Sequence, residues 1–97
     1  MKTALVRPAA AADIVEAHDW YETQRAGLGE EFLTAVAAAI DGVVAHPEGY
    51  PVLHRETRRA LLGRFPYGLF YRLVAGEVVV VACFHASRRP RDWKLRR

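Results

Sequence analysis

Residues 58–89, RRALLGRFPYGLFYRLVAGEVVVVACFHASRR, decide the fold of this chain. Buried-type and polar residues alternate over residues 57–63, which is the period of a strand with one buried face. A turn sequence at residues 65–68 follows, and the dipeptide Ala75-Gly76 separates the apolar segments 69–74 and 78–84. The stretch therefore predicts three successive strands. The last of them is apolar on both faces, so we expect it to be covered on both sides.

Two amphipathic helices are predicted before these strands, over residues 9–26 and 30–47. The apolar stripe of the first consists of Ile14, Ala17 and Tyr21, widened by Val15 and Trp20. The stripe of the second consists of Phe32, Val36, Ile40 and Val43, beside an alanine-rich seam (Ala35, Ala37, Ala38, Ala39) that allows close packing against the sheet. The short segment Gly27-Leu28-Gly29 between them predicts a link in an antiparallel helix hairpin.

The remaining segments complete an α+β fold. Residues 3–7 predict an opening strand closed by Pro8, and residues 47–54 predict a loop. The predicted order is β-α-α-β-β-β, with the helix hairpin on one face of a small, mostly antiparallel twisted sheet. At 97 residues we expect one domain, residues 1–97, in which the basic tail 90–97 is ordered near Arg88 and mobile toward Arg97. The sequence has neither a membrane-length apolar run nor a signal peptide, which predicts a cytoplasmic protein without membrane contacts.

The two halves of the chain differ sharply in charge. Residues 1–50 contain three basic and eight acidic residues, whereas residues 51–97 contain eleven basic and three acidic ones. Such asymmetry favours an anionic partner for the C-terminal half, either a nucleic acid, an enzyme that acts on one, or an acidic protein segment. Ten of those eleven basic residues are arginines, which suit bidentate recognition of phosphate or carboxylate. The alternative is that two oppositely charged faces merely keep the fold in solution.

The sequence excludes several kinds of chemistry. It has no glycine-rich phosphate loop, no nucleophile elbow and a single serine, Ser87. The four histidines are not spaced for a metal site, and Cys83 lies in an apolar run where a buried thiol is expected. We therefore predict no metal and no cofactor.

His85 is the one residue whose position favours catalysis. It ends the last predicted strand, three residues before Arg88, so an imidazole that titrates near neutrality would lie beside guanidinium charges. Metal-free RNA cleavage needs a base, an acid and a cation for the phosphorane. His85, Arg72 and Arg88 could supply the acid and the charge, whereas Glu56 is the only carboxylate near the first arginine-rich strand. A polar strand end without catalytic function is the alternative.

Several segments in the same order and spacing resemble the RelE/ParE superfamily of bacterial toxins from type II toxin–antitoxin systems. They are ADIVEAHDWYE, GLGEEF, the loop with Pro47 and Pro51, RRALLGRFPYGLFYR and VVVVACFHASRRPRDW. The resemblance covers nearly the whole chain and points to the ParE-like branch, once called plasmid stabilisation proteins. It implies the same fold order that the residue pattern predicts.

The resemblance implies a growth-inhibiting toxin that forms a hetero-oligomer with an antitoxin, whose disordered or helical C-terminal segment wraps and neutralises it. We expect this segment on the exposed apolar residues of the helix hairpin and on the sheet edge. Its acidic side chains would meet the arginines of the central stretch (Arg58, Arg59, Arg64, Arg72).

Two targets are possible within the superfamily. ParE-like members resemble inhibitors of DNA gyrase without nuclease chemistry, and the contact residues expected here are Arg88, Arg89, Arg91 and Trp93. RelE-like members cut mRNA on the ribosome with a basic cluster and a C-terminal acid. This chain lacks the lysine-rich catalytic strand and has no tyrosine after Arg72, so a non-enzymatic gyrase inhibitor is favoured over a metal-independent endoribonuclease using His85, Arg72 and Arg88. A third alternative is an inert remnant that only binds the antitoxin.

Overall fold

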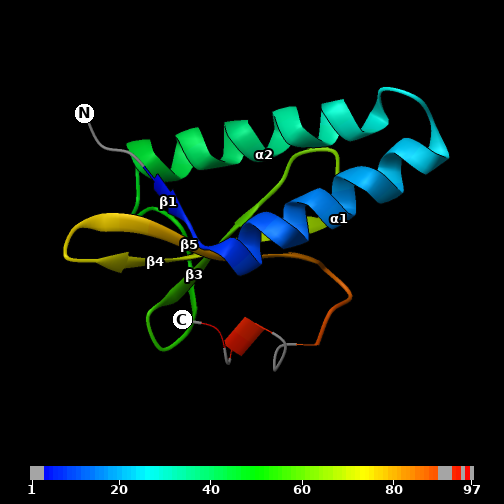
Figure 1. Ribbon diagram of the computed structural model, residues 1–97. Coiled ribbons are helices and arrows are strands. Elements are labelled where there is room, and N and C mark those ends of the chain that lie inside the picture. The colour runs from blue at the N-terminus through cyan, green and yellow to red at the C-terminus, as the bar shows by residue number, and fades with distance from the viewer. Residues whose placement is uncertain (1–3, 90–92, 95, 97) are drawn as a thin grey trace.

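Two helices and a five-stranded sheet build the molecule. The computed structural model describes residues 4–89, 93, 94 and 96. Its elements are β1 (Ala4–Val6), α1 (Pro8–Gln24), α2 (Leu28–Ala45), β2 (Val52–His54), β3 (Thr57–Leu61), β4 (Tyr67–Val74) and β5 (Glu77–His85). The sheet order is β1-β5-β4-β3-β2, and only the β1–β5 pair is parallel. The helix hairpin lies on one face of the sheet (Figure 1), which confirms the predicted α+β arrangement.

The segment predicted as a loop contains one additional strand. Val52 pairs with Arg58 and His54 pairs with Thr57, so the sheet gains a short edge strand, β2. The prolines at positions 47 and 51 are genuine loop signals, but the ladder with β3 extends the three residues after them. Strand formation at such an edge is decided by the neighbouring strand and not by the segment's own period.

The helices begin and end earlier than predicted. Pro8 occupies the first turn of α1, where its missing N–H costs no hydrogen bond. The link between the helices shrinks to residues 25–27, because Leu28 and Gly29 already belong to α2. Gly29 is buried at the crossing of the helices, and a Cβ there would lie 2.7 Å from the His18 carbonyl oxygen. This glycine therefore permits close helix packing and is not a break.

The predicted apolar stripes are correct at their centres and too wide at their margins. Ala17 and Tyr21 are buried, whereas Val15 and Trp20 are 57% and 56% exposed. Successive residues turn by about 100° around a helix axis, so positions 15 and 20 lie on opposite flanks of the stripe. On α2, Ala35 and Ala39 pack against the core, but residues 37 and 38 of the alanine seam are exposed.

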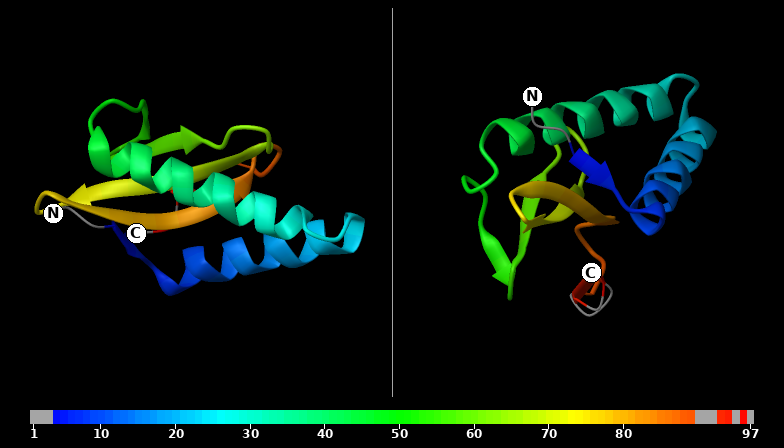
Figure 2. Two further views of the ribbon diagram at one scale, coloured as in Figure 1. Left: turned by 90° about the horizontal axis from the view of Figure 1, so that it is seen from above. Right: turned by 60° about the vertical axis from the view of Figure 1, so that its left-hand side comes forward.

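The sheet is covered on both faces. The main core lies beneath the helices and includes Phe32, Leu69 and Tyr71. A smaller core on the opposite face comprises Phe70, Val79, Val81, Ala82, Phe84 and Trp93. The short C-terminal segment carrying Trp93 lies on that face, away from the helices (Figures 1 and 2). β5 contributes to both cores, as its uniformly apolar sequence predicts.

An irregularity in β5 changes the direction of its second half. Phe70 pairs with Ala82 and Tyr71 with Val80, so Val81 is an extra residue without a partner on β4. Val81 and Ala82 consequently both face the smaller core. A bulge of this kind bends the strand.

Neither of the described helices, α1 and α2, is long and apolar enough to cross a membrane.

Candidate functional site

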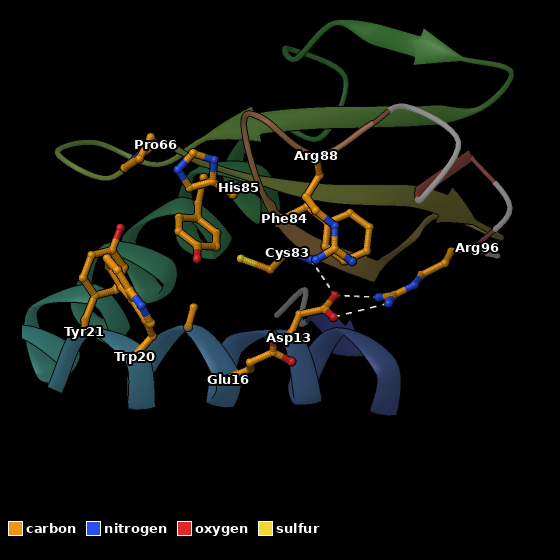
Figure 3. A pocket seen from close by; sticks show the side chains of 12 residues that line it. Asp13, Glu16, Trp20, Tyr21, Pro66, Cys83, Phe84, His85, Arg88 and Arg96 are labelled. Atoms are coloured by element: carbon orange, nitrogen blue, oxygen red, sulfur yellow. Dashed lines mark hydrogen bonds and ion pairs between the residues drawn. The ribbon is translucent and has the colours of Figure 1, made fainter. Parts of the chain in front are cut away.

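A cavity of about 650 Å³ lies between α1 and the C-terminal half of β5. Figure 3 shows side chains from both elements turned toward this space. The lining residues are Asp13, Glu16, Ala17, Trp20, Tyr21, Pro66, Tyr67, Cys83, Phe84, His85, Arg88 and Arg96. The cavity thus combines an aromatic wall with both acidic and basic side chains.

The cavity exists because β5 extends beyond the end of its neighbour β1. β1 pairs only with residues 78–80, and Pro8 then starts α1, which leaves the outer edge of residues 81–85 without a strand. Two side chains replace the missing strand. The Asp13 carboxylate accepts the Cys83 N–H at 3.0 Å, and Arg96 donates to the Val81 carbonyl oxygen at 3.4 Å.

Asp13 and Arg96 also form an ion pair with each other. Two nitrogens of the guanidinium donate to the two carboxylate oxygens, at 2.5 and 3.3 Å (Figure 3). Both side chains are partly buried. The pair joins the first helix to the C-terminal segment across the sheet edge. Neither residue was predicted as part of a site, because nothing local in the sequence connects positions 13 and 96.

His85 is held in one orientation at the end of the cavity. Its ring contacts the Tyr67 ring edge-on, with centroids 5.3 Å apart. The Ser87 N–H donates to Nδ1 at 3.0 Å, and the Ser87 hydroxyl lies 2.8 Å from the same atom. Because Nδ1 accepts a hydrogen bond from the backbone N–H, the neutral ring carries its hydrogen on Nε2.

Cys83 also lines this cavity. Burial raises the pKa of its thiol to about 12, so this thiol is not a nucleophile.

The structure separates the residues proposed for RNA cleavage. His85 pairs with Tyr67 on the helix side of the sheet, whereas Arg72 pairs with Val79, which belongs to the core on the opposite face. Arg72 donates instead to Glu56 at 2.6 Å. Arg88 does share the cavity with His85. His85 and Arg88 are therefore neighbours, and Arg72 is not part of their site.

The residues predicted to contact the target have different environments. The Arg88 guanidinium lies over the Phe84 ring at 4.3 Å, and Arg89 is exposed. Trp93 is only 6% exposed and stacks on Phe70 with centroids 4.7 Å apart, so its indole supports the core and does not present a contact face. Arg91 lies outside the described residues.

The arginines predicted to bind an antitoxin all have local contacts. Arg58 donates to the carbonyl oxygens of Glu48 and Tyr50. Arg64 pairs with Glu31 at 2.7 Å, and Arg72 pairs with Glu56. The Arg59 side chain covers Gly68, and its buried Nε has no hydrogen-bond partner among the described residues. These arginines lie on both faces of the sheet and do not form a single patch.

A second groove, of about 420 Å³, runs between α2 and β3. The small side chains Ala35, Ala38 and Ala39 form one wall, and Leu61, which is 63% exposed, belongs to the other. The ion pair between Arg64 and Glu31 is also part of the lining. Among the described residues, no cluster of three or more His, Cys, Asp or Glu side chains is arranged to hold a metal ion.

Comparison with known proteins identifies the family. Residues 5–90 match the family model described as the ParE toxin of the type II toxin–antitoxin system, parDE. A solved structure described as the chromosomal ParDE TA system from P. aeruginosa has a similar fold, with a TM-score of 0.66 and 24% sequence identity. The alignment covers 88% of this chain and 96% of that one. A search of the curated proteins finds no significant match. Since the family match spans nearly the whole chain, this protein belongs to the ParE toxin family of type II toxin–antitoxin systems.

Proposed function

We propose that this protein is a cytoplasmic, growth-inhibiting toxin that acts by binding DNA gyrase and catalyses no reaction itself. Membership of the ParE toxin family is the observation that carries the proposal. The separation of Arg72 from His85 supports it, because a nuclease centre built on those residues would need them within reach of one phosphate. The contact surface proposed is the end of β5, where Arg88 and Arg89 are exposed beside His85.

The test is a gyrase assay with the purified chain. The toxin should inhibit supercoiling or raise the amount of cleaved DNA complex at micromolar concentration. Replacing both arginines, Arg88→Ala with Arg89→Ala, should weaken this effect at least tenfold, since interface arginines often contribute about 1–3 kcal/mol each. The control is Arg7→Ala, which removes an exposed arginine at the start of α1. Unchanged supercoiling at micromolar toxin contradicts the proposal.

We further propose that the antitoxin segment occupies the groove between α2 and β3. β2 leaves β3 after Arg59, so the outer edge of β3 near Leu61 is open to a further strand or helix. Leu61 offers apolar area, and Arg64 offers a positive charge in the groove lining. An acidic, amphipathic segment fits this combination.

The antitoxin site is tested by measuring complex formation with Leu61→Asp. A carboxylate in the groove should weaken binding strongly and restore toxicity in cells that express the antitoxin. Val74→Asp is the matched control, because Val74 is also exposed but lies at the far end of β4. Equal loss of binding in both variants would argue against the groove.

Expression of the chain in cells without the antitoxin tests the two alternatives, a nuclease and an inert antitoxin partner. New mRNA 5′ ends after induction, lost in His85→Ala, would show that the toxin cleaves RNA and would contradict the gyrase proposal. Normal growth after expression without the antitoxin would leave only the antitoxin-binding function.

A further inference from the structure

A further cavity, distinct from the two described above, opens on the sheet face opposite the helices. It lies between the β2–β3 turn and the C-terminal segment. Its volume is about 270 Å³. The lining residues are His54, Arg55, Glu56, Thr57, Arg72, Lys94 and Arg96. Four of these seven side chains carry a fixed positive charge, and one carries a negative charge. The cavity is therefore a concentrated cationic site that the toxin family alone does not explain.

The cations differ in how far they are neutralised. Arg72 is paired with Glu56, and Arg96 is paired with Asp13 from the other side of the sheet edge. Arg55 and Lys94 have no carboxylate within salt-bridge distance in the described part of the chain. Among the described residues, these two positive charges at the cavity therefore have no carboxylate partner.

The charges around the cavity also affect the pKa of His54, which belongs to its lining. Partial burial, together with the charges of Lys94 and Arg55, holds its pKa below the usual range. The ring is thus neutral at physiological pH and can donate one N–H without adding to the repulsion. The Thr57 hydroxyl is a further lining group that can donate.

Arg55, which lines the cavity, has an unfavourable backbone conformation. Arg55 has φ 52 in the two-residue turn between β2 and β3, a left-handed conformation that favours glycine or asparagine. Unfavourable backbone conformations cluster at functional sites. An arginine at this position costs stability but places a guanidinium at the rim.

The cationic surface continues beyond the cavity. Arg96 lines both this cavity and the large one beside α1. The guanidinium groups of Arg96 and Arg88 both lie over the Phe84 ring, at 4.5 and 4.3 Å. A basic track therefore runs from the β2–β3 turn past Arg96 to the end of β5. Its regular positive charges suit a phosphodiester backbone, whereas a single carboxylate would need only one of them.

We propose that the cavity lined by Arg55, Lys94 and Arg72 binds a backbone phosphate of a nucleic acid whose next phosphates follow the track toward Arg88. Arg55 and Lys94 supply two positive charges that no described carboxylate neutralises. Arg72 joins them by exchanging the exposed Glu56 carboxylate for a phosphate oxygen, because such exposed ion pairs are weak. The inference goes beyond gyrase binding, since it requires no other protein.

Direct binding of the full chain to a short, fluorescently labelled single-stranded DNA tests the proposal by anisotropy. The key variant is Arg55→Gly with Lys94→Gln. Glycine accepts the left-handed turn, so the removal of charge does not add backbone strain. Affinity should fall about tenfold, and the slope of log affinity against log salt should decrease in magnitude by about 0.7, the value for one lost phosphate contact on a single strand.

The control removes two charges from elsewhere, Arg7→Ala with Arg25→Ala, and should keep at least half of the wild-type affinity. Thermal melts check that both variants fold. Inorganic phosphate and polyglutamate serve as competitors. At matched ionic strength, phosphate but not polyglutamate should displace the labelled DNA and lower its anisotropy. The proposal is overturned if the key variant binds as wild type, if the control weakens equally, if polyglutamate competes as well as DNA, or if phosphate binds and DNA does not.

Discussion

Glu22 shows how one side chain joins the two helices. Gly27 supplies the cap position of α2 but has no side chain to bond the first N–H groups. The Glu22 carboxylate, projecting from α1, accepts the Gly29 N–H at 2.8 Å and the Gly27 N–H at 3.3 Å. These backbone hydrogen bonds lower the pKa of Glu22 below its ordinary value. One residue therefore caps the second helix and sets its angle to the first.

The depressed pKa predicts a pH-dependent loss of stability in Glu22→Gln. A carboxyl whose pKa is lower in the folded state stabilises the protein above its ordinary pKa, and this contribution disappears as pH falls through the folded-state value. The variant should therefore melt at a lower temperature than wild type near pH 7, and the difference should shrink toward about pH 3. Thermal melts followed by circular dichroism measure this gap. Glu48→Gln, an exposed carboxylate, is the control, and a gap that widens on acidification would refute the capping role.

At the scale of elements, the β4–β5 hairpin is the longest antiparallel pair in the described sheet. Its two turn residues, Ala75 and Gly76, have φ 52 and 81. Two left-handed residues in succession match the twist of a two-residue hairpin, as the sequence predicts. Glycine suits the second position, but alanine at the first carries a Cβ in an unfavourable conformation.

Ala75→Asn should therefore stabilise the protein by about 0.5–1 kcal/mol, because asparagine tolerates the left-handed region better than alanine. Ala75→Val should have the opposite effect, since a branched Cβ is disfavoured there. Urea unfolding of both variants measures the two changes in free energy. A neutral or destabilising asparagine would show that the turn is not limited by the conformation of this residue.

At the scale of the whole molecule, the Asp13–Arg96 ion pair ties the C-terminal segment to the first helix. The segment would otherwise be held chiefly by Trp93 on Phe70. Asp13 also satisfies the Cys83 N–H, so its loss leaves a donor on the open strand edge without an acceptor. Arg96 also lines both the cavity beside α1 and the cationic cavity. The shape of each cavity therefore depends on this contact.

A double-mutant cycle with Asp13→Ala and Arg96→Ala tests this connection. Asp13→Ala alone should cost about 1–3 kcal/mol because it strands a partly buried donor. The coupling energy of the pair should exceed that of the exposed pair Glu31–Arg64, for which less than about 1 kcal/mol is expected. Urea unfolding of the single and double variants supplies both values. Equal coupling in the two pairs would mean that the Asp13–Arg96 pair does not hold the C-terminal segment more firmly than an exposed ion pair would.

Local sequence by itself determined much of the fold. The hydrophobic period placed both helices and the strands β3, β4 and β5, because helix and strand periods are set by each segment's own backbone geometry. Ala75-Gly76 determined the tight turn for the same reason. The uniformly apolar residues 78–84 determined that β5 is covered on both faces. Several segments together also carried the resemblance to the toxin family, which the match over residues 5–90 confirms.

Only the tertiary structure decided the sites. Strand β2 exists because β3 provides its hydrogen-bonding partner. Val15 and Trp20 are exposed because they lie outside the face of α1 that packs on the core. The faces of the sheet separate Arg72 from His85, and the bulge at Val81 with the early end of β1 opens the edge that Asp13 and Arg96 close. Such contacts join residues distant in sequence, whose positions depend on strand register, and no local period contains that information.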